Sequence, residues 1–404
     1  MTLATGILSG MRVIEAAAFV AAPLGGLTLA QMGADVIRID TLGGGLDHQR
    51  WPVTPQGVSL FWCGLNKNKR SVALDLTRAE GRELAMALIS APGPDAGLLL
   101  TNFPPRAWLD FDALQKRRGD LIQITLQGDR HGGSAVDYTV NPQLGLPFIT
   151  GPQGHAGAVN HVLPAWDLVT GQMVATALLA AERHRSRTGL GQHVKLALQD
   201  VALAVMGHLG FLAEAQLGQV RERHGNELFG AFGRDFTTAC GERVMVVGLT
   251  QKQWRALCTA TRLTDEMTQL GVRLSLNLQA EGNRFQARTE IAVLVGAWVA
   301  QRTIGQVASA FNEHSVCWSR YQTLAQLVHS DPSCSTANPM FTTIDQPGVG
   351  QLLAPSLPLR FDATPRVPAQ PAPRLGEHTE QVLHELLGLD AAAFGQLHDR
   401  AVVG

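Results

Sequence analysis

The sequence predicts an α/β fold, in which a large Rossmann-like domain built on a mostly parallel sheet is joined to a smaller α+β domain. Two observations lead to this prediction. Over about the first third of the 404 residues, apolar strand-like runs alternate with helical patterns, which is typical of a parallel sheet covered on both faces. After "RERHGN" the pattern changes to a hairpin followed by amphipathic helices. A chain of this length is enough for two or three domains.

Each element of the expected large domain has a local signal. Pro23 suits the first position of a helix over 23–31, and Gly33 suits its C-cap. A strong helical pattern over 168–185 ends in basic residues, which favour the negative end of the helix dipole. The apolar run 199–218 reads as one long helix that is buried on most sides, as at a domain or subunit interface. Strands are expected at 11–18, 34–40, 70–76, 96–102, 120–128 and 193–198, with a further helix at 78–89.

The second half of the chain predicts a different architecture. A hairpin is expected around Cys240, Gly241 and Glu242, followed by helices near 251–261 and 287–303. Six prolines between residues 353 and 375 predict an extended arm without helix. One last helix, over 377–389, closes the chain.

Composition excludes several classes of function. The formal net charge of -1 argues against nucleic-acid and anionic-membrane partners, because both need a concentrated positive field. The five cysteines are scattered and odd in number, so we expect reduced thiols and no metal site. The start "MTLATGILSGMRVIE" lacks a signal-peptide pattern, and no run of eighteen apolar residues follows. These features predict a soluble cytoplasmic protein.

Asp167 is the first candidate for chemistry. It stands between the strand-like "NHVLPAW" and the long helical pattern, a favoured N-cap position, and a plain cap is the commoner explanation. The same position allows a second interpretation, because the helix dipole would keep the carboxylate ionised. An ionised carboxylate can attack an activated acyl group and form a covalent acyl-enzyme. Nearby backbone N–H groups would then stabilise the oxyanion.

Each of the other candidate site residues also has an ordinary structural explanation. The turn in "AAAFVAAP" lacks the GxGxxG fingerprint, so Asp40 is weak support for a nucleotide-dependent dehydrogenase. The helix start at Pro23 and the run 43–45 are possible phosphate sites or ordinary turns. The basic run "NKNKR" at 66–70 is either a phosphate clamp or a solvated turn. Loop histidines 131, 155 and 161 read as surface residues.

Several blocks in order resemble the class III CoA-transferases. They are "LSGMRVIEAAAFVAAPLGGLTLAQMGADVIRID", "GLNKNKRSVALDL", "TNFPP", "LLAAERHRSRTGLGQHVKLALQD" and "PAPRLGEHTEQVLHELLGL". The resemblance spans essentially the whole chain. It implies two interlocked subunits, each with a large domain in residues 1–205, a linker in 206–224 and a small domain in 225–325. The proline-rich arm and last helix, in 326–404, would return to the large domain.

The resemblance also implies roles for particular residues. The family nucleophile, an aspartate, falls on Asp167, which would then be both cap and nucleophile. The family's CoA contacts fall near Val20, Ala21, Leu74, Leu76, Asn102 and Phe103. An arginine that the family often uses is replaced by Leu109 and Asp110, and Arg106 is the substitute. No metal or permanently bound cofactor is implied, since coenzyme A enters as part of the acyl-CoA substrate.

Two departures from the family pattern narrow the expected activity. Racemases of the family use a histidine where this chain has Val136, and valine cannot exchange a proton. The glycine run with which some intermolecular transferases close the site is also missing, and "GNELFGAFGRD" occupies that region. The first departure disfavours a racemase, and the second fits a site that keeps its acid bound.

Further blocks resemble those members that move CoA between the two carboxyl groups of mesaconate. They are "GGGLDHQRWPV", "VDYTVNPQLGLPFITGP", "NHVLPAWDLVTGQM", "LFGAFGRDF" and "CSTANPMF". We expect His48, Arg50 and Arg234 to hold the spare carboxylate. The alternatives are an intermolecular CoA-transferase acting on a dicarboxylic acid, and a non-catalytic CoA-binding subunit.

Overall fold

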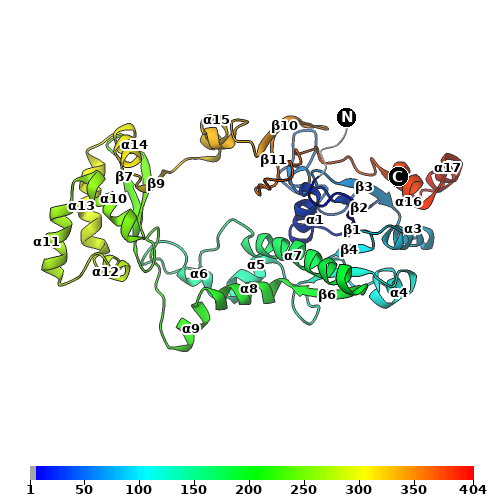
Figure 1. Ribbon diagram of the computed structural model, residues 1–404, viewed down its shortest axis with the longest axis horizontal. Helices are drawn as coiled ribbons and strands as arrows, with labels where there is room; N and C mark the ends of the chain where they lie inside the picture. The colour runs from blue at the N-terminus through cyan, green and yellow to red at the C-terminus, as the bar shows by residue number, and fades with distance from the viewer. Residues whose placement is uncertain (1–5) are drawn as a thin grey trace. The chain divides into compact units, whose positions relative to one another are not determined.

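The computed structural model describes residues 6–404, and contacts divide them into two compact units (Figure 1). The first unit comprises residues up to 144, 162–213 and 332–404. The second comprises 145–161 and 214–331, so a short segment from the first half of the chain packs with the later residues. The expected domain boundaries stay a prediction.

The first unit is built on a six-stranded parallel sheet, which confirms the predicted α/β class. Apolar residues at successive positions of each strand face opposite sides, so both faces need cover. In sheet order the strands are β3 (Arg70–Leu74), β2 (Asp35–Thr41), β1 (Arg12–Ala16), β4 (Leu98–Thr101), β5 (Ile122–Gln127) and β6 (Gln192–Ala197). The chain runs outward from β1 to β3 and then restarts at β4, beside β1. This reversal makes a topological switch point between β1 and β4, where α/β proteins usually bind ligands.

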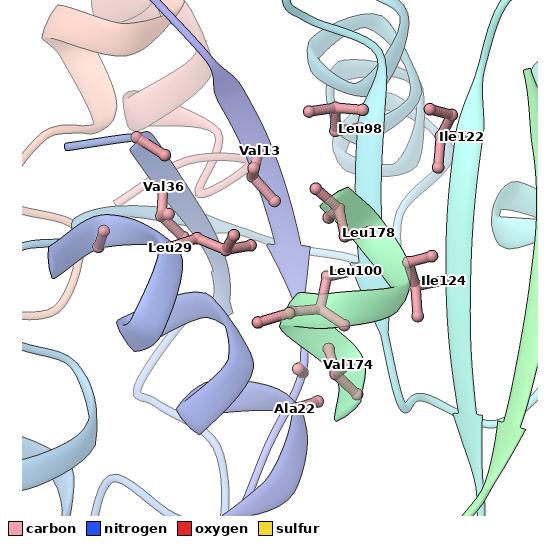
Figure 2. Close-up of a cluster of buried hydrophobic side chains, with 14 of the residues drawn as sticks. Val13, Ala22, Leu29, Val36, Leu98, Leu100, Ile122, Ile124, Val174 and Leu178 are labelled. Atoms are coloured by element: carbon pink, nitrogen blue, oxygen red, sulfur yellow. The ribbon is translucent and has the colours of Figure 1, made fainter. Parts of the chain in front are cut away.

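One face of the sheet is covered by α1 (Ala21–Gln31) and α7 (Ala165–Thr188). Figure 2 shows their side chains meeting those of the strands, for example Leu29 and Val174 over Val13 and Leu100. The other face is covered by α3 (Ala79–Ser90), α4 (Phe111–Arg117) and α16 (Thr379–Leu387). The C-terminal segment of the chain therefore completes the core that the N-terminal half begins.

Three helix predictions need correction. Helix α1 begins at Ala21, so Pro23 is its third residue; proline is tolerated there because the first-turn N–H groups have no partner in the helix. The expected helix 199–218 is two helices, α8 (Leu198–His208) and α9 (Phe211–Gln216), separated at Gly210, whose φ is +81°. A further helix, α17 (Ala391–Asp399), follows the one expected to be last.

The second unit contains the predicted hairpin, β7 (Phe232–Thr237) with β8 (Arg243–Gly248), and β9 (Cys317–Arg320) extends it to three antiparallel strands. Two predicted helices are also present, α10 (Gln251–Thr261) and α13 (Arg288–Ala300). The remaining helices of this unit are α6 (Leu146–Ile149), α11 (Thr264–Leu274), α12 (Glu281–Gln286), α14 (Ile304–Glu313) and α15 (Leu324–Ser330). Buried aromatic and aliphatic side chains of these strands and helices, including Phe232, Trp254 and Phe311, form its core.

Smaller elements complete the first unit. They are α2 (Leu60–Leu65), α5 (Asp137–Gln143), the 3-10 turns Ala107–Leu109 and Pro332–Cys334, and the hairpin of β10 (Phe341–Gln346) and β11 (Gly350–Pro355). The proline-rich arm has no helix, as predicted, although its first three residues close this hairpin. In residues 6–404 no single helix is long and apolar enough to cross a membrane; α13 and α14 meet that standard only as a pair, bent by 118°.

Candidate active site

Asp167 lies in the first turn of α7 as its third residue, and it is not the helix cap. Pro164 occupies the N-cap position and makes no capping hydrogen bond through its side chain. The helix therefore starts earlier than the sequence suggested, and the prediction that Asp167 is the N-cap was wrong. The residue stays near the positive end of the helix dipole, with a partly buried side chain.

The backbone N–H groups at the start of α7 already have acceptors. Those of Trp166 and Asp167 donate to Oδ2 of Asp137, at 2.7 and 3.3 Å. Those on either side donate to the carbonyl oxygens of Leu163 and Pro164. The expected oxyanion donors are thus not supplied by this turn, because its N–H groups are occupied.

The pKa of Asp167 is raised to about 6. Burial is the main cause, the charge of Asp137 adds to it, and Arg50 opposes both. The dipole therefore does not hold the pKa of this carboxyl low, as the sequence analysis expected. Since the value still lies below neutrality, most of the carboxyl groups are ionised at pH 7.

Arg50 is the cation that acts on Asp167. Its guanidinium lies 5.7 Å from the ring centre of Phe19 and 5.1 Å from that of Phe61, within the range of cation–π attraction. Phe19 is half-exposed and has a φ of +67°, an uncommon conformation for a bulky residue that often accompanies function. The turn after β1 therefore presents an aromatic ring beneath the arginine.

The other two residues expected to hold a carboxylate are placed differently. His48 belongs to the same loop as Arg50, and its ring meets Trp62 edge to face at 5.0 Å. Arg234 lies on β7 in the second unit, where it pairs with Glu227 at 3.1 Å. The structure thus associates Arg50 with Asp167 and gives Arg234 another partner.

The turns at the switch point are joined by a pair of hydrogen bonds. Asn102 follows β4, and its side-chain amide donates to the carbonyl oxygen of Ala18 at 2.8 Å. The N–H of Ala18 donates back to Oδ1 of Asn102 at 3.0 Å. Val20 and Ala21, two of the expected CoA contacts, are nearby in sequence but buried, so any contact they make with a ligand comes mainly through the backbone.

A cavity of about 930 Å³ opens beside the ends of β4 and β5. Three of the expected CoA contacts, Asn102, Phe103 and Arg106, line it, together with His193 and Lys195 of β6. Its volume lies in the range of small-molecule sites. Of the two residues that replace the family arginine, Leu109 is buried and Asp110 caps α4 through the N–H of Ala113, whereas Arg106 is exposed.

Leu74 and Leu76 are positioned mainly by the core. Leu74 is fully buried under the C-terminal residues and bridges to Val403, and Leu76 packs against the same cluster. A ligand contact at Leu74 is limited to its backbone.

The basic run 66–70 is not a solvated turn, because Asn66, Lys67 and Lys69 are buried. Nζ of Lys69 is buried and lies 2.9 Å from both carboxylate oxygens of Glu15. Arg38 links the same glutamate to Asp40 and Asp47, at 3.3, 2.7 and 2.9 Å. Asp40 is therefore a buried structural partner of Arg38. The short apolar strands contain a buried network of charged side chains that the periodicity of the sequence did not reveal.

Asp137 and Asn141 are the site residues that sequence analysis missed. Both are buried on α5, and Oδ1 of Asn141 accepts the indole N–H of Trp166 at 3.2 Å. Two polar residues four apart lie on one face of a helix. That spacing in "VDYTVNP" is the signal that would have marked a polar face turned toward another element.

Fold and site together define an α/β protein with an ionisable carboxylate at a helix start and a ligand-sized cavity beside the ends of β4 and β5. The chain belongs to CoA-transferase family III, because the sequence model of that family matches residues 8–379. This confirms the resemblance drawn from the sequence blocks.

Individual members of the family differ in how similar they are to this chain. The chain is 60% identical over 400 residues to 2-methylfumaryl-CoA isomerase of Chloroflexus aurantiacus, covering 98% of each chain. It is 28% identical over 400 residues to succinyl-CoA:mesaconate CoA-transferase of Haloarcula hispanica, covering 94% of this chain and 96% of the other. Among solved structures, a CaiB/BaiF family protein from Brucella suis shares the fold, with a TM-score of 0.76 at 23% identity, covering 95% of this chain and 100% of that one.

Proposed function

We propose that the chain converts 2-methylfumaryl-CoA (mesaconyl-C1-CoA) to 3-methylfumaryl-CoA (mesaconyl-C4-CoA). The reaction moves CoA from one carboxyl group to the other within a single molecule, so the chain is an isomerase. The observation that carries this proposal is the 60% identity, from end to end, with 2-methylfumaryl-CoA isomerase. Enzymes of different substrate choice in the same family, such as the Haloarcula transferase, are far less similar.

Asp167 is the proposed nucleophile. Its carboxylate attacks the C1 thioester carbonyl, the C–S bond breaks, and a mixed anhydride and the CoA thiolate result. The thiolate attacks the aspartyl carbonyl, which gives an aspartyl-CoA thioester and the free mesaconate dianion. The C4 carboxylate then attacks this thioester, whose C–S bond breaks to release the thiolate and form a new anhydride. The thiolate attacks the mesaconyl carbonyl of this anhydride, and the bond between that carbonyl carbon and the aspartyl oxygen breaks. The C4 thioester leaves and the Asp167 carboxylate is restored without net proton transfer.

Retention of the dianion makes the second half-reaction effectively unimolecular, a large entropic advantage. Arg50 is the proposed partner of the spare carboxylate, because it is the cation that acts on Asp167. The rings of Phe19 and Phe61 restrict its guanidinium. In this role His48 is a neighbour that helps to shape the loop, and Arg234 is a weaker candidate because it already pairs with Glu227.

CoA is proposed to bind as part of the substrate. The cavity at the ends of β4 and β5 supports this, since Asn102, Phe103 and Arg106 line it and Lys195 adds a second cation suited to phosphate. No permanently bound cofactor takes part in the proposed steps.

Val136 supports transfer over racemisation. It directly precedes Asp137, at the N-cap position of α5. A side chain without an ionisable group cannot remove or return an α-proton.

An intermolecular CoA-transferase is the second candidate, favoured by the similarity to succinyl-CoA:mesaconate CoA-transferase. The test is chromatography of the purified protein with mesaconyl-C1-CoA alone, and then with labelled free mesaconate. The C4 isomer should form without added acid and without label in the thioester. Conversion that requires the acid, or free incorporation of label, would establish the intermolecular reaction instead. Asp167→Asn is the inactive control.

A further inference from the structure

The start of α7 is capped by a residue from another helix. The first N–H groups of a helix have no partner within it, and the residue at the N-cap of α7 offers no side-chain acceptor. Asp137, the first residue of α5, supplies one oxygen to two of these groups. Its side chain is buried, with the residue only 1% exposed, so the bonds are shielded from water.

A second contact from α5 holds the same turn. One turn beyond Asp137, Asn141 accepts the indole N–H of Trp166. The residue next to Asp167 is thus held through its backbone by one α5 side chain and through its ring by another. A helix turn held at two points has little freedom to rotate, which restricts the direction of the side chain that follows.

We propose that Asp137 is a positioning residue for Asp167, which caps the first turn of α7 and thereby sets the direction of the reacting carboxylate. The inference rests on the proposed function, in which Asp167 attacks the thioester. It assigns Asp137 no contact with substrate.

The position of Asp137 also has an electrostatic consequence. Within residues 6–404, two charged groups on other elements act on Asp167: Asp137 on α5 raises its pKa, and Arg50 from the loop after β2 lowers it. A more basic carboxylate is a better nucleophile as long as it remains ionised. Loss of the Asp137 charge should therefore lower the pKa of Asp167 and its reactivity together.

Two substitutions separate the bonds from the charge. Asp137→Asn keeps a side-chain oxygen as acceptor and removes the charge, whereas Asp137→Ala removes both. We expect Asp137→Ala to lower kcat by about 100-fold, as for a small misplacement of a reacting group, with little change in KM. Asp137→Asn should recover much of kcat, with the acid limb of its pH profile moved to lower pH. The control is Asp265→Asn, an exposed aspartate in the first turn of α11, which should match the wild type.

A purely structural role predicts other results. In that case both variants would lose activity in proportion to lost folded protein, and the remaining activity would keep the wild-type pH profile. That outcome, or wild-type kcat in Asp137→Ala, would overturn the proposal.

A readout independent of turnover distinguishes this inference from the proposed function. Carbon-13 NMR of protein labelled at the aspartate carboxyl carbon follows Asp167 directly, since its signal is the one lost in Asp167→Asn. We expect its titration midpoint to lie near pH 6 in the wild type and to fall in Asp137→Asn. An unchanged midpoint refutes the coupling whatever the reaction is. A shifted midpoint in a protein that forms no C4 isomer supports the coupling and refutes the function.

Discussion

At the scale of single residues, the local environment of Asp167 determines how its carboxyl group ionises. Burial and a neighbouring carboxylate raise the pKa of this aspartate to about 6, against the attraction of Arg50. The group is then more basic than a free aspartate and still mostly charged at neutral pH. In the proposed cycle the Asp167 carboxylate acts first as the nucleophile and finally as the leaving group. An intermediate basicity suits both of these steps.

The first prediction concerns pH. Only the ionised carboxylate attacks, so kcat should rise as the pH increases through about 6 and level off above 7. Steady-state rates of isomerisation between pH 5 and 8 check this, with folding monitored by circular dichroism over the same range. A flat profile with the protein folded throughout would exclude Asp167 as the titrating nucleophile.

Asp167→Asn should abolish activity and stabilise the fold. Loss of a nucleophile typically costs on the order of 10⁴-fold or more in kcat. A carboxyl whose folded-state pKa is raised favours folding at low pH and loses that contribution as the pH rises through about 6. At pH 8 its removal should therefore raise stability, by at most about 3 kcal/mol for a shift of this size. Urea unfolding at pH 8 and pH 4.5 measures the gain, which should shrink at the lower pH; an equal gain at both would contradict the linkage.

At the scale of elements, the close approach of α1 and α7 decides where Asp167 lies. A Cβ atom on Gly171 would come within 2.8 Å of the carbonyl oxygen of Ala21 and 2.9 Å of Cβ of Leu24. Gly25 on α1 faces Val174 of α7 at a similarly short distance. An added methyl group would meet the backbone of α1 at Gly171 and chiefly the Val174 side chain at Gly25, so the space at both positions favours glycine.

Gly171→Ala should therefore separate the two helices. We expect a loss of about 1–3 kcal/mol of unfolding free energy from overpacking, and lower activity, because Asp167 is one turn away. Gly282→Ala on α12 is the matched control, since nothing lies within 4 Å of its added methyl group. Urea denaturation and kcat of both variants test this expectation. Unchanged stability and activity in Gly171→Ala would mean that the two helices adjust freely to the added methyl group.

The buried ionic network reaches the loop that carries Arg50, because Arg38 pairs with Asp47 of that loop at 2.9 Å. Lys69 neutralises Glu15 and also donates to the carbonyl oxygen of Pro23 in the first turn of α1, at 2.8 Å. Burial lowers the pKa of Lys69 to about 8, and the glutamate offsets part of that effect. The network therefore connects strands, loop and helix through groups that are costly to leave unpaired.

Removal of one partner should be strongly destabilising. Lys69→Met leaves Glu15 buried with a single cation nearby, so we expect a loss of about 3–5 kcal/mol. Lys116→Met, at an exposed position of α4, should change stability by less than about 0.5 kcal/mol. Chemical denaturation of both variants measures the change in unfolding free energy. Comparable losses in Lys69→Met and Lys116→Met would show that the network contributes little to stability.

At the scale of the whole molecule, we propose that two chains form a homodimer. Residues 199–218 were expected at an interface, and in the single chain Leu203, Leu209 and Leu212 are 38%, 65% and 41% exposed. Leucines exposed so close together favour association. Sedimentation velocity should give about twice the chain mass of 43.3 kDa. Leu209→Asp should weaken the dimer, and a monomeric wild type at micromolar concentration would refute it.

Much of the fold followed from local pattern. Hydrophobic runs such as those of β4 and β5 are short, apolar and bounded by turns, so their type and order were predictable. The ends of the helices were less predictable than the type and order of the strands. The start of α7 moved because Asp137, thirty residues earlier, supplies the missing cap. The break at Gly210 was missed because the apolar pattern continues across it.

The candidate site divides in the same way. Asp167 and Asn102 stood out through family blocks, and Arg50 was chosen from one of those blocks. The aromatic rings around Arg50 and the buried pair Lys69 and Glu15 were invisible, because each joins residues far apart in the chain. A basic run that looked solvated is buried for this reason.

By itself, then, the sequence determined the α/β class and the family, and it marked Asp167 as the proposed nucleophile, because these depend on patterns of neighbouring residues. Only the tertiary structure decided that Asp167 lies inside α7, that Asp137 caps this helix and raises the pKa of Asp167, and that Arg50 lowers that pKa. Proton affinity and direction are properties of an environment, and packing assembles that environment from segments that local sequence does not connect.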